Sequence, residues 1–355
     1  MAELPERVLI VVNCARPPVG EALAAALARL GVKTRIFFSQ TCNTLYDRLV
    51  IHTINHLAHN LRLAPKTVDL FEGHPQSHKE YRNREFLKVF QEFQPDLVFL
   101  TRGLRFKLET LREIQQRSTV FCWFTESEKR VGEIAPEIPF YHHTYFFSSV
   151  SLEIARQLGF AHVSLLQHAV DTARFYPMDL PQVYDWCFVG QWHARRQQYI
   201  EGLAEVSPNF VIYGSRWRKR LWRRPDLWLK VKGRGVWDEA LTRLYNQTKV
   251  VINVSVWAGE QQPAGGVNLR LLEVPACRSC LLTDYAEDAA RLLVPEKEFV
   301  SAASLPEMQE KLAELLADEA KRRQIAQAGY EKAAAIRTYD HLVAEVLADW
   351  ARLNG

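Results

Sequence analysis

The sequence predicts an α/β protein with two parallel-sheet domains, and three features of the chain support this. Its 355 residues are enough to form two hydrophobic cores. Short apolar runs rich in β-branched residues alternate with stretches of helical spacing, as strands and helices do in layered α/β folds. The alternation occurs in two series, separated by a stretch that contains Pro177 and Pro181. We therefore expect two Rossmann-like domains joined by a short linker.

The first series is expected to form the N-terminal domain. Its predicted strands fall at residues 7–13, 32–39, 96–101 and 119–124, within 139–149, and at 162–168. No Gly-x-Gly-x-x-Gly motif follows the first of them, which argues against a dinucleotide-dependent dehydrogenase. Glu126 and Glu128 come directly after the strand at 119–124, and such sheets bind ligands beyond the carboxyl ends of their strands. Both are candidates for ligand binding or general-base catalysis, and solvated loop acids are an equally open interpretation.

The second series is expected to form a separate domain. Its predicted strands fall at residues 184–189, 210–213, 249–255 and 280–283. Gly190 and Gly214 follow the first two strands, and Arg195 and Arg196 open the helix after Gly190. Arginines at such a strand end can bind an anionic group, although a surface arginine pair remains the alternative.

A glycine loop stands at the centre of the second series. Gly265 and Gly266 follow the strand at 249–255 in the sequence and precede a helix predicted over residues 267–277. Unpaired backbone N–H groups and the positive end of a helix dipole favour an anion at such a position, and glycine lets a phosphate come close. Arg270 could add a guanidinium to a phosphate, and Glu273 could accept hydrogen bonds from two ribose hydroxyls. A glycine pair alone is weak evidence for phosphate binding.

Residues 265–277, GGVNLRLLEVPAC, resemble the donor-binding motif of GT-B glycosyltransferases, in particular the CgeB-like (spore maturation protein) group. In that group an N-L-R-x-x-E-x-x-A-C segment precedes a short strand ending in Thr-Asp, as it does here. The resemblance covers about residue 96 to the end of the chain. It departs from the pattern at Gly265, where related retaining enzymes have the first of two glutamates, and at Arg278, where glycine is usual.

The resemblance implies a nucleotide-sugar site in the second domain. Arg270 would contact the diphosphate and act in catalysis as charge grows on the leaving group, and Glu273 would hold the ribose. Glu126 and Glu128 would act on the acceptor side as the other catalytic candidates. The residues implied in donor binding are Gly190, Arg195, Arg196, Gly214, Gly265, Gly266, Val267, Asn268, Arg270 and Glu273.

The implied architecture is GT-B, in which two Rossmann-like domains face each other across a cleft and C-terminal helices partly cross back. We expect an acceptor-side domain over residues 1–172 and a linker over 173–183. A nucleotide-sugar-binding domain would follow over 184–338, with a last helix over 339–355 returning to the first domain.

The resemblance implies a glycosyltransferase, of hexosyltransferase type, that moves a sugar from a nucleoside diphosphate to an unknown glycan, lipid or protein acceptor. No Asp-x-Asp motif is present, so we expect no metal cofactor. His52, His56 and His59 recur at a helical spacing that could hold a metal, but a polar helix face is favoured because no carboxylate or cysteine accompanies them. A nucleotide-sugar epimerase and a non-catalytic binding protein of the same fold remain alternatives.

Residues 216–234 are the most polarised segment of a chain whose net charge is only +4. They hold nine Arg or Lys against one Asp, a difference of +8, with Trp217, Trp222 and Trp228 interleaved. This composition suits an anionic membrane surface, or contacts to donor phosphates, better than nucleic acid. No signal peptide or membrane-spanning run is evident, so we expect a cytoplasmic protein with peripheral contact at the inner face of the membrane.

Overall fold

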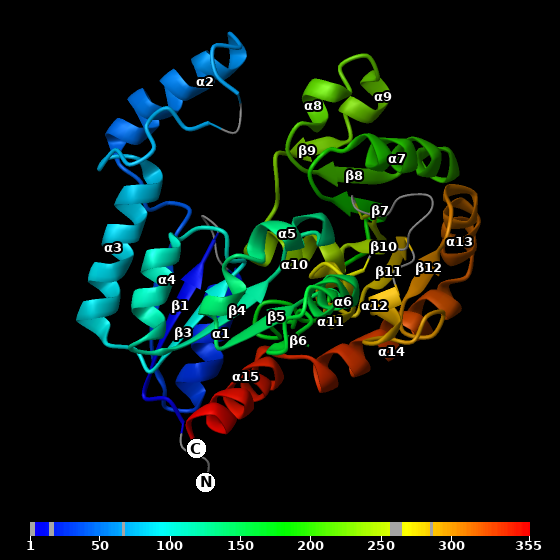
Figure 1. Ribbon diagram of the computed structural model, residues 1–355. Helices are drawn as coiled ribbons and strands as arrows, with labels where there is room; N and C mark the ends of the chain where they lie inside the picture. The colour runs from blue at the N-terminus through cyan, green and yellow to red at the C-terminus, as the bar shows by residue number, and fades with distance from the viewer. Residues whose placement is uncertain (1–3, 14–17, 66–67, 256–264, 285–286) are drawn as a thin grey trace. The chain divides into compact units, whose positions relative to one another are not determined.

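The computed structural model describes residues 4–13, 18–65, 68–255, 265–284 and 287–355 (Figure 1). The chain divides into two compact units. Unit 1 comprises Met1–Leu166 and Val343–Gly355, and unit 2 comprises Gln167–Leu342. The residues expected to form the linker, 173–183, therefore lie inside unit 2. Each unit has its own sheet and its own buried cores.

The sheet of unit 1 has six strands in the order β2-β1-β3-β4-β5-β6, all parallel. The strands are β1 (Arg7–Val12), β2 (Lys33–Phe38), β3 (Leu97–Thr101), β4 (Thr119–Phe124), β5 (His143–Phe146) and β6 (Val163–Leu165). The residues of β4 are buried on both faces, which explains why it reads as a continuous apolar run. The sequence predicted all six strands.

Helices cover both faces of this sheet. The helices of unit 1 are α1 (Pro18–Arg29), η1 (Asp47–Ile51), α2 (His52–Asn60), α3 (His78–Phe93), α4 (Leu108–Gln115), η2 (Glu128–Arg130), α5 (Val131–Ile134), η3 (Ile138–Phe140) and α6 (Ser149–Gln157). Leu9 and Val98 share a buried cluster with Phe86 of α3 and Leu111 of α4. The alternate residues of the same strands therefore face the opposite side of the sheet.

The C-terminal helix, α15 (Tyr339–Asn354), covers that opposite side. Its residues Val343 and Val346 line a small apolar cavity together with Val8 of β1. Tyr145 of β5 donates a hydrogen bond from its hydroxyl to Asp349, at 2.8 Å. The last helix thus completes unit 1, and the predicted return of the C-terminus to the first sheet is confirmed.

The sheet of unit 2 also has six parallel strands, in the order β12-β11-β10-β7-β8-β9. They are β7 (Tyr184–Val189), β8 (Phe210–Tyr213), β9 (Val231–Gly233), β10 (Thr248–Asn253), β11 (Cys280–Asp284) and β12 (Val300–Ala302). The four central strands agree with the prediction. The two edge strands, β9 and β12, were not predicted.

Unit 2 is likewise covered on both faces. Its helices are α7 (Ala194–Val206), α8 (Trp217–Arg220), α9 (Pro225–Trp228), α10 (Asp238–Asn246), α11 (Arg270–Ala276), α12 (Glu287–Ala290), α13 (Leu305–Ala317) and α14 (Glu319–Ile336). One buried cluster joins the sheet to α7 and α13, and another joins it to α10 and α11. The fold predicted from the sequence, two parallel α/β sheets with helices on both faces, is confirmed.

The helix predicted over residues 267–277 is shorter than expected. It begins at Arg270, four residues after Gly266, and ends at Ala276. Gly266 has a φ of +81°, which takes the chain out of a right-handed helical path. The Asn268 side chain then accepts a hydrogen bond from the Arg270 N–H at 3.0 Å, which competes with an earlier helix start.

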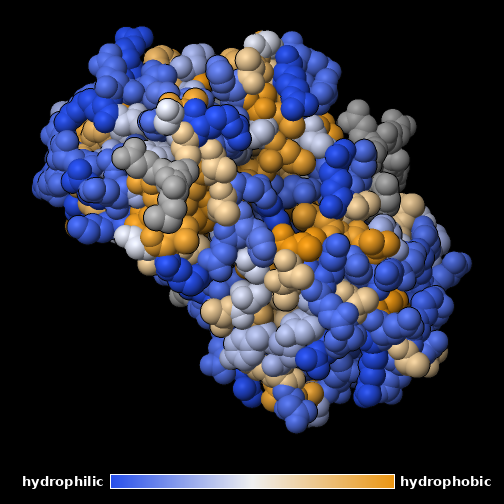
Figure 2. Space-filling view, turned by 90° about the horizontal axis from the view of Figure 1, so that it is seen from below, coloured by the Kyte–Doolittle hydropathy of each residue, from blue (hydrophilic) through white to orange (hydrophobic). Residues whose placement is uncertain are grey.

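Apolar residues are mostly inside the two units. Hydrophilic residues cover most of the face seen in Figure 2, and hydrophobic residues gather in a few groups among them. None of the helices that the structure describes is long and apolar enough to cross a membrane.

Candidate functional site

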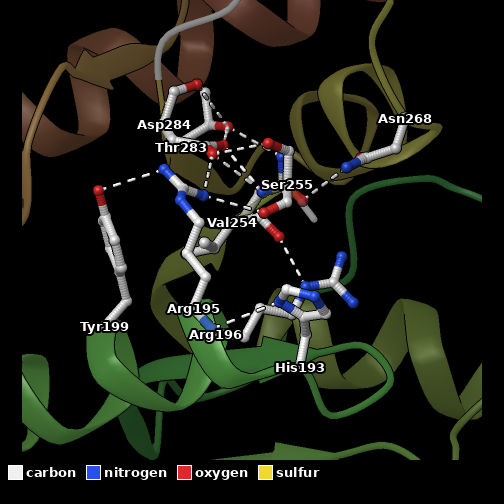
Figure 3. Close-up of polar contacts among 10 residues, drawn as sticks. His193, Arg195, Arg196, Tyr199, Val254, Ser255, Asn268, Thr283 and Asp284 are labelled. Carbon is white, nitrogen blue, oxygen red and sulfur yellow. Dashed lines mark hydrogen bonds and ion pairs between the residues drawn. The ribbon is translucent and has the colours of Figure 1, made fainter. Parts of the chain in front are cut away.

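The candidate site lies in unit 2, where β10 and β11 end side by side (Figure 3). Asn253 of β10 pairs in register with Thr283 of β11, so the residues that follow both strands meet at one edge of the sheet. Ser255 follows β10 and Asp284 ends β11. Parallel α/β sheets bind their ligands at this edge.

A chain of hydrogen bonds joins these strand ends to the segment before α11. Asn268 donates from Nδ2 to the Oδ1 of Asn253 at 2.8 Å, and Asn253 donates from Nδ2 to the Oγ1 of Thr283, also at 2.8 Å. The buried carboxylate of Asp284 accepts from the Ser255 N–H at 3.0 Å and from its hydroxyl at 2.9 Å. Asn268, expected to contact a ligand, is thus occupied in holding its own segment against the sheet.

Arg195 extends this network from α7. It donates from Nη1 to the Ser255 carbonyl at 2.9 Å and to Asp284 at 2.7 Å, and from Nη2 to the Tyr199 hydroxyl at 3.2 Å. His193 accepts from the Arg195 N–H with its ring, at the start of the helix. Arg195 therefore fixes the end of β10, and it keeps few donors for a ligand.

Arg196 is also bound to backbone. It donates from Nε to the Val254 carbonyl at 2.8 Å and from Nη1 to the Gln191 carbonyl at 2.9 Å. Burial lowers the pKa of its guanidinium to about 10, and the nearby charges of Arg270 and Arg195 contribute to this shift. The three arginines are therefore close enough to repel one another, and the site carries a concentrated positive charge.

Gly190 and Gly214 have a packing reason to be glycine. A Cβ at Gly214 would overlap the carbonyl oxygen of Gly190, and one at Gly190 would lie 2.9 Å from the Phe188 ring and 3.2 Å from Nη1 of Arg196. The two glycines let the ends of β7 and β8 come together. Packing alone therefore explains why both positions are glycine, and no ligand is needed for the explanation.

Arg270 differs from the other two arginines. Its side chain is half-buried, and its Nε is enclosed without any hydrogen-bond acceptor in the described part of the chain. No described carboxylate lies within ion-pair distance of it. A buried donor without a partner costs about 1–3 kcal/mol, so native proteins leave few of them except where a ligand binds.

Glu273 follows Arg270 by almost one turn of α11 and is also half-buried. Burial raises the pKa of its carboxyl to about 7, and the charge of Arg270 partly offsets that rise. No residue within the described ranges donates a hydrogen bond to this carboxyl. Tyr245 of α10 is close enough to interact with it. The Tyr245 hydroxyl is buried without a partner, and its pKa is raised by burial and by the Glu273 charge.

The glycine pair differs from its expected role. Both glycines are buried, and the Gly266 N–H, expected to face an anion, donates to Asp288 at 2.6 Å. Asp288 belongs to α12 and is fully buried. Val267 belongs to the hydrophobic core rather than to an open surface. Residues 256–264, which precede the glycine pair, lie outside the described residues.

Glu126 and Glu128 lie in unit 1, at the carboxyl end of β4. Glu126 forms ion pairs with Arg102 and with Arg130, the latter at 2.9 Å. Both oxygens of this carboxylate are therefore engaged by guanidiniums of the same unit. Glu128 has no ion pair with any described residue and stands at the start of η2, where Ser127 provides the cap.

No group of three or more His, Cys, Asp or Glu in the described ranges is arranged to hold a metal ion. The three histidines of helical spacing do not converge on one point. His59 bonds through Nε2 to the Val68 carbonyl at 2.9 Å, and His56 bonds to Asn60.

Sequence reasoning missed four polar residues of this site: Asn253, Tyr245, Asp284 and Asp288. Asp284 had a usable signal, since it is an acid directly after an apolar strand. Asp288 had none, because its partner Gly266 lies 22 residues away and only the folded chain brings the two together.

Residues 193–348, which include Arg195, Arg196, Arg270 and Glu273, match the family model described as glycosyl transferase-like. No curated protein matches the chain.

Solved structures match nearly the whole chain. Sucrose-phosphate synthase from Thermosynechococcus elongatus has 15% sequence identity and a TM-score of 0.70, with 98% of this chain and 99% of that chain covered. HepE from Anabaena, in complex with UDP and glucose, has 12% identity and a TM-score of 0.65, with 98% and 100% covered. A glycosyltransferase from Rickettsia africae has 11% identity and a TM-score of 0.66, with 98% of both chains covered.

At these identities the likeness shows the fold. The chain has the GT-B fold, with two Rossmann-like domains. Within it, the segment from residue 193 to residue 348 is similar to the glycosyl transferase-like family, and that segment carries the arginines and the glutamate of the candidate site.

Proposed function

We propose that this protein is a glycosyltransferase that moves a hexosyl group from a nucleoside diphosphate to an acceptor. One observation carries the proposal. Arg270 has an enclosed Nε with no acceptor among the described residues, and it stands beside the half-buried carboxyl of Glu273 in the segment that matches the glycosyl transferase-like model. A cation and a hydrogen-bond acceptor, neither engaged by the residues that the structure describes, are what a diphosphate joined to a ribose requires.

In this proposal Arg270 binds the diphosphate and Glu273 accepts hydrogen bonds from the ribose hydroxyls. HepE, which shares the fold, was solved with UDP-glucose, which supports a nucleotide-sugar as the donor class. The likeness of GGVNLRLLEVPAC to the CgeB-like motif supports the same two roles. Arg195 and Arg196 hold the strand ends in place and add their charge to the site.

Charge is also the basis of the chemical step. Breaking the bond between sugar and diphosphate leaves negative charge on the diphosphate, and a cation placed there stabilises the transition state more than the bound donor. Three guanidiniums face the two carboxyls of Asp284 and Glu273 at this edge. We propose that this positive surplus takes the role that a divalent ion has in metal-dependent transferases. Activity should then survive dialysis against EDTA.

On the acceptor side we propose that Glu128 is the proton acceptor and that Glu126 positions Arg102 and Arg130. The doubly paired state of Glu126 supports this division, because its negative charge is already balanced.

Titration calorimetry with UDP-, GDP- and dTDP-glucose tests the donor site. We expect micromolar binding of at least one of them, lost in Arg270→Ala. The matched control is Arg323→Ala, which removes an exposed arginine of α14 in the same unit. If the wild-type protein binds none of the donors, the proposal fails.

A time course by NMR separates transfer from the epimerase alternative. A transferase given donor without acceptor leaves the donor intact or hydrolyses it slowly, whereas an epimerase converts it to an isomeric nucleotide-sugar.

A further inference from the structure

A second feature of unit 2 lies apart from the donor site. The short helices α8 and α9 and the edge strand β9 form one corner of the unit, at the end of the sheet next to β8 (Figure 1). We call its exposed surface the basic edge. The basic edge comprises the cations Arg216, Arg218, Lys219, Arg220, Arg223, Lys232 and Arg234 and the apolar side chains Trp222, Trp228, Leu229 and Trp237.

The corner that presents the basic edge is firmly anchored. Trp217 and Leu221 are fully buried, and Leu227 and Val231 nearly so, all in the same core as β7 and β8. Trp217 also donates from Nε1 to the Gly190 carbonyl at 2.7 Å. Each of these anchors lies one to a few residues from an exposed member of the basic edge. The exposed residues are therefore held outward by a folded support.

The charge of the basic edge is largely uncompensated. Asp226 is the only acid between residues 216 and 234, and it is paired with Arg224 at 2.8 Å. Glu201 of α7 also pairs with Arg224, at 3.4 Å. None of the seven cations of the basic edge has a carboxylate within 4 Å among the residues that the structure describes. Such a surface attracts a partner with a high density of negative charge.

Large apolar side chains stand among these cations. Trp222 is 65% exposed, Leu229 64% and Trp237 51%. A single exposed apolar residue needs no explanation, but three beside seven cations that form no ion pair with any described residue are an unusual combination. Tryptophan and leucine inserted between lipid headgroups, with arginines on the phosphates, account for both the apolar and the charged residues.

Nucleic acid fits the same surface less well. Single strands bind by stacking their bases on open aromatic faces. Here Arg223 lies over the Trp222 ring at 4.4 Å, and Arg218 lies over the Trp228 ring at 5.2 Å. Each ring thus has a face covered by a guanidinium of the protein itself. Insertion into a lipid headgroup layer leaves those pairs intact and needs only the exposed edge of each ring.

We propose that the basic edge docks this protein on a bilayer surface rich in anionic lipids. The proposal is independent of the donor site, because the basic edge contains none of the residues assigned to the nucleotide-sugar. It adds a location to the proposed transfer, namely a membrane surface at which a lipid-linked or membrane-associated acceptor is accessible.

Co-sedimentation with vesicles tests the proposal on the full chain. We expect binding to vesicles of phosphatidylcholine mixed with phosphatidylglycerol, little binding to phosphatidylcholine alone, and release by added salt. The double variant Arg220→Glu/Arg223→Glu should bind at least about tenfold more weakly, since each cation near an anionic surface contributes substantially. Trp222→Ala should weaken binding severalfold by removing the inserting side chain.

The control is Arg323→Glu, a charge reversal on an exposed position of α14 outside the basic edge. It should bind vesicles like the wild type, and all the variants should keep the wild-type melting temperature and donor affinity. The proposal is overturned if the wild-type protein does not bind anionic vesicles, or if the double variant binds them as tightly as the wild type. Tighter binding to DNA than to vesicles at the same salt overturns it in favour of a nucleic acid partner.

Discussion

Glu273 couples the stability of unit 2 to its proposed function, and the substitution Glu273→Gln exposes that coupling. The carboxyl has a pKa of about 7 in the folded protein against an ordinary value of 4.5. Because the folded pKa is the higher one, the folded state holds its proton more tightly. The associated stability is fully present below pH 4.5 and is lost as the pH rises through 7.

The size of the effect follows from the shift. A difference of 2.5 pKa units corresponds to about 3 kcal/mol at most. Solvent reaches the half-buried side chain, and its screening reduces this to about 2 kcal/mol. Glutamine keeps the shape but cannot ionise. Glu273→Gln should therefore match the wild type near pH 5 and exceed its stability by about 2 kcal/mol at pH 8.

Urea denaturation of both proteins at pH 5 and pH 8 measures this difference, with Glu310→Gln, an exposed carboxylate of α13, as the control. The same variant should lose donor affinity at pH 8, because glutamine replaces one of the two acceptor oxygens with an NH2 group that cannot accept a hydroxyl hydrogen bond. A variant that is as stable as the wild type at both pH values, or less stable at pH 8, would refute the assignment of a half-buried carboxyl to which no described residue donates a hydrogen bond.

Three further substitutions separate binding from folding. Arg270→Ala should weaken donor binding by about 10- to 100-fold, measured by calorimetry, without lowering the melting temperature, because its Nε has no hydrogen-bond partner among the described residues. Gly214→Ala should destabilise the protein by about 3 kcal/mol or more in urea, since the added methyl overlaps the Gly190 carbonyl. Glu128→Gln should reduce kcat more than Glu126→Gln in a transfer assay; the reverse order would exchange their proposed roles.

The core of the fold was predictable because parallel strands that are buried on both faces have nearly continuous apolar sequences. Most strands of unit 1 and the central four of unit 2 show that pattern, whereas β2 (KTRIFF) has only one buried residue. The edge strands β9 and β12, of three residues each, did not follow from it. Arg270 and Glu273 were found because both belong to one short segment with a recognisable order of residue types.

The hydrogen-bond network around Arg270 and Glu273 could not be predicted from the sequence. Gly266 meets Asp288, and Asn253 meets both Thr283 and Asn268, across separations that no local spacing records. The same limit explains why Gly266 was expected to offer its N–H to an anion. A glycine before a helix looks the same in sequence whether its N–H is open or taken by a buried acid.

The three arginines of the site divide two tasks, and their hydrogen bonds show how. Arg195 and Arg196 donate hydrogen bonds to the backbone carbonyls of Ser255 and Val254, and these bonds fix the chain after the end of β10. The Arg270 side chain donates no hydrogen bond to the described residues. Its charge nevertheless adds electrostatic repulsion to the effect of burial in lowering the pKa of Arg196. A dianionic ligand at Arg270 would relieve that repulsion. Ligand binding should therefore raise the melting temperature of the protein by more than contact with a single guanidinium would. Arg270→Ala should abolish this additional rise in melting temperature.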